Sequence, residues 1–153
     1  MNKYYKKLLV LSISVIIISI FIYSSTDFQE EKFKKKMASD SLWLQFAHCM
    51  ETNDIQFLME NSLDTIQCAE CNLDGKSENE YYESRFVFEK HIDKLMHLNS
   101  LHNRYYSIYQ DDSLMHVVYS VKTTNTVEGG YNLIFNFIKV DDKYLFKGMI
   151  MTP

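Results

Sequence analysis

Apolar and polar residues alternate near the end of the chain, where the sequence reads YNLIFNFIKV, DDK and YLFKGMIM. This alternation predicts a two-stranded hairpin with its turn at Asp141–Asp142. Phe137 then lies opposite Phe146 on an apolar face, and Asn136 lies opposite Lys147 on a mixed face. A slip of one residue would set Lys147 beside Phe137, so the pattern favours this register. The same register pairs Leu133 with Ile150, Phe135 with Gly148, and Ile138 with Leu145.

Helical spacing of apolar residues precedes the hairpin. Residues 40–50 carry one apolar stripe and predict the first helix of the domain. A capping box of Asn53 and Gln56 predicts that a second short helix starts there. A third helix begins at Ser77 or Ser84 and ends near His97. The first stripe consists of Trp43, Phe46, Ala47 and Met50.

The stretch from Arg104 onward has the character of strands. RYYSIYQ and SLMHVVYSVKT, joined at Asp111–Asp112, predict a second hairpin, and residues 125–130 form a glycine-containing loop before the last one. Residues 65–72 are expected to be extended or irregular. Helices followed by antiparallel strands predict an α+β domain, with helices packed on one face of a curved antiparallel sheet.

The N-terminus carries the strongest apolar run. Residues 8–23 contain no charged residue and follow three lysines, a layout typical of a signal peptide or a short membrane helix. We expect residues 1–26 to be an uncleaved anchor, residues 27–39 a charged stalk, and residues 40–153 a domain outside the cytoplasm, in the periplasm or at the cell surface. The alternative is cleavage near Ser24, which would release a secreted domain.

The expected soluble part is acidic. Residues 27–153 carry 13 Lys and Arg against 20 Asp and Glu, a net charge of −7. Such a surface is a poor binder of nucleic acid, so no nucleic-acid partner is expected, and the expected membrane contact is residues 8–26.

Cys68 and Cys71 form a CxxC pair, which we interpret as a candidate structural disulfide in an exported domain. A turn must then lie between the two residues, since a regular strand would point them to opposite faces. Pairing of Cys49 with one of them, or free thiols, are the alternatives. Cys49 borders the first apolar stripe and is expected to be buried.

Catalytic and metal-binding patterns are weak. A zinc site from His48, Cys49, Cys68 and Cys71 would need neighbouring helix residues to face one ion. The other histidines lack a metal-binding spacing: Asp93 and His97 can pair on a helix, and His116 is expected on the less apolar face of its strand, at the surface or in an interface. The sequence has no glycine-rich phosphate loop and no GxSxG. We therefore expect no cofactor, no metal and no catalytic residue, and we assign no ligand-binding residue.

The order of elements resembles the nuclear transport factor 2-like superfamily, also called SnoaL-like or ketosteroid-isomerase-like, over about residues 40–153. The resemblance rests on LWLQFAHCM, FVFEKHIDKLM and FNFIKVDDKYLFKGM. It implies a cone of curved antiparallel sheet whose mouth is closed by N-terminal helices. Catalytic members carry an Asp, Tyr or His inside the cone, and no such residue maps onto this chain.

Three functions follow as hypotheses. The first is a membrane-anchored, non-catalytic domain that binds a small molecule or a protein. The second is a scaffold subunit of an envelope or secretion assembly, by analogy of layout. The third, an isomerase- or hydratase-type enzyme, requires a polar residue deep in a pocket. A mixed outer sheet face is expected to be free for a homodimer; it carries Ile134, Ile138, Leu145 and Met149.

Overall fold

The computed structural model describes residues 30–71, 80–96, 98, 100–101, 103–122 and 130–153. The chain divides into two compact units, residues 1–38 and residues 39–153. Within the first unit, residues 30–38 are helical. Among the described residues, no helix is both long enough and apolar enough to cross a membrane. The expected anchor, residues 1–26, lies outside the described part of the chain.

The second unit begins with a helix, residues 39–52, which we call the N-terminal helix. Its buried face is the stripe that the sequence predicts, because residues three and four apart share one side of a helix. Near its end, Thr52 donates its hydroxyl to the carbonyl of His48 at 2.8 Å, and Asn53 adopts a positive φ of 57°. The four stripe residues Trp43, Phe46, Ala47 and Met50 are all fully buried.

Helix α2, Ile55–Glu60, starts one residue later than the sequence predicts. Asp54 is the N-cap, and its Oδ1 accepts a hydrogen bond from the backbone N–H of Phe57 at 3.1 Å. The predicted capping box is therefore wrong: Asn53 turns the chain, and Gln56 donates to Glu60 along the helix at 3.0 Å.

The predicted third helix is two short helices, α3 over Ser84–Lys90 and α4 over Ile92–Leu95. Its alternative start at Ser84 is confirmed, and the other start, Ser77, lies outside the described residues. His91 separates the two helices with a φ of −137°, which is outside the helical range. Helix α3 buries Val87 and Phe88, and helix α4 buries Leu95.

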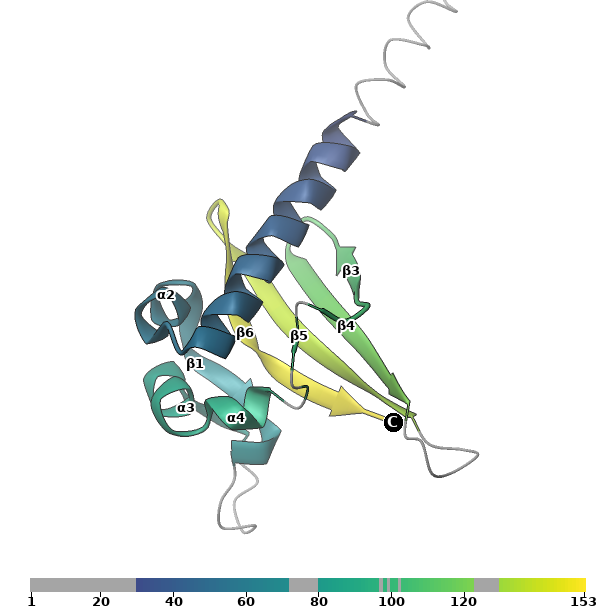
Figure 1. Cartoon of the computed structure of the whole chain (residues 1–153). Helices are drawn as coiled ribbons and strands as arrows, with labels where there is room; N and C mark the ends of the chain where they lie inside the picture. The colour runs from purple at the N-terminus through teal and green to yellow at the C-terminus, as the bar shows by residue number, and fades with distance from the viewer. Residues whose placement is uncertain (1–29, 72–79, 97, 99, 102, 123–129) are drawn as a thin grey trace, which may run out of the picture. The chain divides into compact units, whose positions relative to one another are not determined.

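The sheet has six strands in the order β2-β1-β6-β5-β4-β3. Figure 1 shows the N-terminal helix, α2, α3 and α4 on one face of this sheet. The predicted α+β class is confirmed, and so are both hairpins; in the first, Asp111 Oδ1 accepts from the backbone of Ser113 and Leu114, each at 2.7 Å. The strands are β1 Ser62–Cys68, β2 Tyr81–Glu83, β3 Ser107–Gln110, β4 Leu114–Lys122, β5 Gly130–Val140 and β6 Lys143–Thr152.

The sheet is mixed, so the prediction of a purely antiparallel sheet is wrong. Strand β1 pairs in parallel with β6, and β2 pairs with the other edge of β1. The sequence predicts extended or irregular chain over residues 65–72. Residues 62–68 form β1, which completes the hydrogen bonding of β6, otherwise an open edge. Ile66 and Cys68 point into the core and are fully buried. The sheet is open and does not close into a barrel.

The register of β5 and β6 follows the prediction only near the turn. Val140 pairs with Lys143 and Phe137 with Phe146, as predicted. A β-bulge then shifts the register, so Asn136 pairs with Gly148, and the predicted partner Lys147 is the extra residue. The shift turns Met149 inward, at 3% exposure, where the sequence placed it outward. Beyond the bulge, Phe135 pairs with Met149, Ile134 with Ile150 and Leu133 with Met151, which corrects the predicted pairs.

Substitutions on the two faces of β5 should lower the free energy of unfolding by different amounts. Phe137 is fully buried and lies 5.3 Å, ring centroid to ring centroid, from both Phe46 and Phe146. We expect Phe137→Ala to lower the free energy of unfolding by about 3–5 kcal/mol. Asn136→Ala removes one partly buried hydrogen bond and should cost about 1 kcal/mol. Chemical denaturation of the two variants measures both changes, and equal small losses would contradict the assignment of faces.

Candidate interaction face

The space between the N-terminal helix and the sheet is filled by aromatic rings. The Trp43 ring centroid lies 4.7 Å from that of Phe135, 5.9 Å from that of Tyr119 and 6.2 Å from that of Phe137. Phe46 packs on Phe146 at 4.9 Å. These centroid distances are those of rings in direct contact. The space under the N-terminal helix is therefore filled by side chains of the protein itself.

The Tyr119 hydroxyl is the polar group at the centre of this cluster. It accepts a hydrogen bond from Trp43 Nε1 at 2.8 Å and donates one to the Leu101 carbonyl at 2.9 Å. Burial raises the pKa of Tyr119 above its ordinary value, so the phenol stays protonated. A hydroxyl whose proton already bonds to a backbone carbonyl is poorly placed to act as an acid on a substrate.

The buried polar residues of the described chain are Ser39, Asn61, Ser62 and Ser84. Three of them serve the fold: Ser39 donates to Gln110, and Asn61 and Ser62 donate to backbone carbonyls of α2. Ser84 contacts the Met59 sulfur at 3.5 Å. This set contains neither a carboxylate nor a histidine, which are the groups an acid–base enzyme would place in a pocket.

Cys68 and Cys71 are joined by a disulfide, with a Cα–Cα distance of 5.4 Å. The 3-10 turn Ala69–Cys71 follows β1 directly and brings the second sulfur back toward the first. Both cysteines are buried. Cys49 is a buried free thiol, and burial, with a smaller effect of the Asp54 carboxylate, raises its pKa above the ordinary value. It therefore has little thiolate character.

The three described histidines do not assemble a metal site. His48 is exposed on the N-terminal helix, while Cys68 and Cys71 are consumed by their disulfide. Within the described ranges, no group of three His, Cys, Asp or Glu side chains is arranged to hold a metal ion. His91 packs against Phe86, with ring centroids 4.7 Å apart. His97 and His102 lie outside the described residues, so the Asp93–His97 pair cannot be placed.

A shallow pocket of about 320 Å³ lies where α2, β1 and the start of α3 meet. Its lining contains two acidic residues, Asp64 and Glu83, and one basic residue, Arg85. The Arg85 guanidinium already pairs with Glu89 at 3.1 Å. The remaining lining residues are Met59, Thr65 and Ser84.

The second face of the sheet carries no described helix, and we call it the open face (Figure 1). Strand alternation and the pairing register sort its residues into rows that run across β4, β5 and β6. Two rows are apolar, and a polar row lies between them. The first apolar row is Leu114, Ile138 and Leu145; the polar row is His116, Asn136 and Gly148; the second apolar row is Val118, Ile134 and Ile150.

The polar row continues to β3 at one edge of the sheet and to β1, next to the other edge. His116 pairs with Tyr109 of β3, and Gly148 pairs with Gln67 of β1. His116 Nδ1 lies 2.6 Å from Asn136 Oδ1, and Gln67 donates to Glu80 at 2.9 Å. Tyr109 is 62% exposed. A row that joins amide, imidazole and phenol groups across one surface is suited to polar recognition.

The centre of the open face is uncharged in an acidic domain, and charged residues of the same face lie toward its ends and its β2 edge, at Lys122, Lys143 and Glu83. The three rows contain no Asp, Glu, Lys or Arg, and the next row, Ser120, Asn132 and Thr152, contains none either. Residues 39–153 as a whole carry 9 Lys and Arg against 17 Asp and Glu, a net charge of −8. The lack of charge at the core of a surface is a compositional mark of protein interfaces.

Sequence reasoning found part of this face and missed the alignment of its central row. It placed Ile134, Ile138 and Leu145 outward. The structure confirms this, since Ile138 and Leu145 lie in the first apolar row and Ile134 lies in the second. It also placed His116 and Asn136 on this side of the sheet, as observed. It missed their alignment with Gly148 and Gln67, because that alignment depends on the bulge and on the β1–β6 pairing. No protein-family model, curated protein or solved structure was found to match the chain.

Proposed function

We propose that this protein is a membrane-anchored, non-catalytic binding domain that recognises a protein surface through its open face. Residues 8–26 would hold it at the membrane, with residues 39–153 outside the cytoplasm. The observation that carries the proposal is the face opposite the helices, with its regular rows and its uncharged centre. The packed aromatic interior favours a protein partner over a small molecule, because the region under the N-terminal helix is occupied by Trp43, Phe46 and Phe135.

The pattern of rows fits a second copy of this chain. A homodimer places the same patch on both sides of its interface. If two open faces meet about a two-fold axis that lies along the strands or along the polar row, apolar rows meet apolar rows and the polar row meets itself. The uncharged centre of this face also lets two domains of net charge −8 approach where their repulsion is weakest.

The size of the open face agrees with this partner. Five strands spaced about 4.8 Å apart, over about eight residues of 3.3 Å each, cover roughly 600 Å² in projection. A stable interface of standard size buries about 800 Å² of accessible surface per partner. The accessible area of a face with projecting side chains exceeds its projection, so the two values are comparable.

The resemblance to the nuclear transport factor 2-like cone remains part of this proposal. Helices on one face of an open sheet support it (Figure 1). The parallel β1–β6 pair departs from the antiparallel cone that the resemblance implied.

Charge changes at Asn136 test the dimer in the full chain. Asn136 lies in the polar row, which meets itself in both two-fold arrangements. Asn136→Asp keeps the oxygen that contacts His116 and adds one negative charge, whereas Asn136→Lys adds one positive charge. Two differently tagged copies are co-expressed and extracted in detergent, and their co-purification is measured. Like-charged pairs should co-purify at least about 10-fold less than wild-type pairs, since facing like charges cost more than 1.4 kcal/mol.

The mixed pair supplies the decisive comparison. One Asn136→Asp copy with one Asn136→Lys copy should regain wild-type co-purification, because the two charges then attract. Leu44→Asp is the matched control, since Leu44 is 40% exposed on the N-terminal helix and lies off the open face. Wild-type recovery for like-charged pairs would remove the open face as the dimer contact.

A photo-reactive residue at Val118 separates this reading from the scaffold alternative. Val118 lies in the second apolar row, next to His116. In intact membranes, a product of twice the chain mass supports the homodimer. A discrete product with a different protein supports a scaffold subunit of an envelope assembly. The same probe at Glu89, on α3, should give neither product; cross-linking at both positions or at neither would reject the open face as a binding surface.

A further inference from the structure

The first unit presents an exposed apolar pair on its described helix. Phe33 is 64% exposed and Met37 is 58% exposed. They are four residues apart, so their side chains lie on the same side of the helix, one turn from each other. Large apolar side chains at this exposure gain free energy when an apolar environment covers them.

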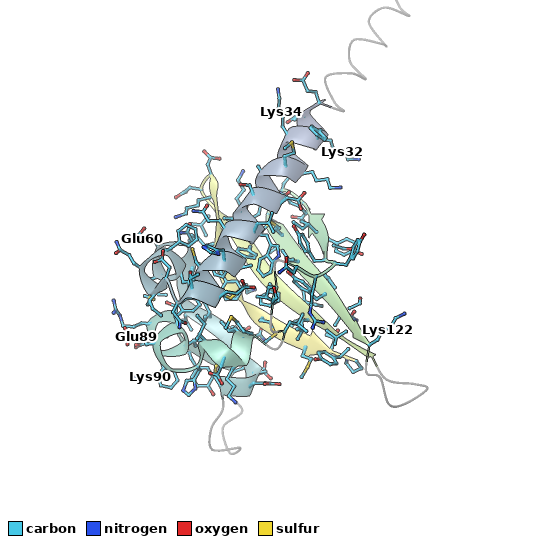
Figure 2. All side chains as sticks on the ribbon, in the orientation of Figure 1. Lys32, Lys34, Glu60, Glu89, Lys90 and Lys122 are labelled. Atoms are coloured by element: carbon cyan, nitrogen blue, oxygen red, sulfur yellow. A yellow bond between two sulfur atoms is a disulfide. The ribbon has the colours of Figure 1, made fainter. Side chains whose placement is uncertain are left out.

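Lysines flank this apolar pair. At about 100° per residue, Lys34 and Lys36 lie about 80° to either side of the direction that Phe33 and Met37 share. Figure 2 shows Lys32 and Lys34 projecting from different sides of the helix. The Glu30 carboxylate is paired with Lys34 Nζ at 2.7 Å. Lysine side chains in such positions can place their methylene groups along an apolar surface and their ammonium groups in a polar headgroup layer.

Charge is divided unequally along the chain. Residues 32–38 carry four lysines and no Asp or Glu, whereas residues 39–153 carry a net charge of −8. This basic segment belongs to the helix of Phe33 and Met37, and Lys3, Lys6 and Lys7 precede the proposed anchor. An acidic partner surface therefore matches the first unit and is repelled by the second.

We propose that residues 30–38 are an interfacial membrane helix that binds anionic lipid headgroups, with Phe33 and Met37 inserted at the boundary of the acyl chains. This inference rests on the proposed anchor, because residues 8–26 bring the helix to the bilayer surface. The basic flanks and the apolar pair match the pattern of helices that lie in the headgroup layer.

An environment-sensitive probe at position 33 tests the helix in the full chain. Phe33→Cys offers a reactive thiol, since Cys49 is buried and Cys68 and Cys71 are bonded to each other. The NBD-labelled chain is reconstituted in vesicles of phosphatidylcholine alone, or with roughly one third phosphatidylglycerol. We expect NBD emission to shift to shorter wavelength and to rise several-fold in the anionic vesicles only. About 1 M NaCl, which shortens the Debye length to about 3 Å, should reverse much of this change.

The control and the readouts distinguish the outcomes. Glu31→Cys retains every lysine and lies about 140° from the apolar pair, so its label should stay in water in both vesicles. Vesicle flotation reports the anchor separately. If the chains float but the label at position 33 shows the same NBD emission as the label at position 31, this inference is overturned and the anchor stands. Chains that fail to float would overturn the anchor and the inference together.

Discussion

Trp43→Ala is expected to lower the free energy of unfolding by about 3–5 kcal/mol, and by at least as much as Phe137→Ala. Trp43 is fully buried, and its ring centroid lies within 6.5 Å of those of five aromatic residues. Its loss removes the largest fully buried side chain that joins the N-terminal helix to the sheet. It also leaves the Tyr119 hydroxyl without the donor at 2.8 Å. Chemical denaturation followed by circular dichroism measures the change.

A double-mutant cycle separates packing from hydrogen bonding at this position. Trp43→Phe keeps an aromatic ring but removes the indole N–H, and Tyr119→Phe removes the hydroxyl that accepts from it. Each single variant leaves a buried polar group without this partner and should cost about 1–3 kcal/mol. The double variant should cost less than the sum of the two. Strict additivity would mean that the two side chains do not interact through this bond.

The local pattern was enough to predict the elements whose partners are near in sequence. The buried stripe of the N-terminal helix follows from apolar residues at spacings of three and four. Both hairpins follow from alternation on either side of an Asp-Asp pair, and the predicted turns at Asp111 and Asp141 are confirmed. In each case the residues that bury one another lie on one helix or on adjacent strands, so the sequence alone contains the information.

The failures in the sheet involve contacts between distant segments. The sequence predicts only extended or irregular chain over residues 65–72, because the parallel partner of β1, strand β6, lies about eighty residues later. The bulge at Lys147 depends on that same pairing. The break at His91 has no strong local signal, because neither glycine nor proline occurs in FVFEKHIDKLM. The open face was only partly predicted for the same reason, since its central row crosses five strands.

Gly148 explains why the hairpin departs from simple alternation. Its φ of +134° belongs to a region that favours glycine. A Cβ added there would collide with the backbone nitrogen and oxygen of Gln67 and would lie 2.6 Å from the Gln67 Cβ. Strand β1 can therefore approach β6 only over a residue without a side chain. The bulge brings Gly148 opposite Gln67 on one side and Asn136 on the other.

Gly148→Ala should consequently cost about 3–5 kcal/mol, the sum of backbone strain and overpacking against β1. The loss should be concentrated in β1, so hydrogen exchange at Gln67 and Cys68 should accelerate more than exchange at the β4–β5 pairs. Trp43 is the chain's one tryptophan, and its fluorescence reports global unfolding. Gly130→Ala is the matched control. A Cβ at this position would meet one atom, the Val121 carbonyl oxygen at 3.1 Å, so the substitution should lower the free energy of unfolding by about 1 kcal/mol. Equal costs for the two glycines would mean that β1 does not need the close approach at Gly148, and the polar row of the open face would lose its connection to Gln67.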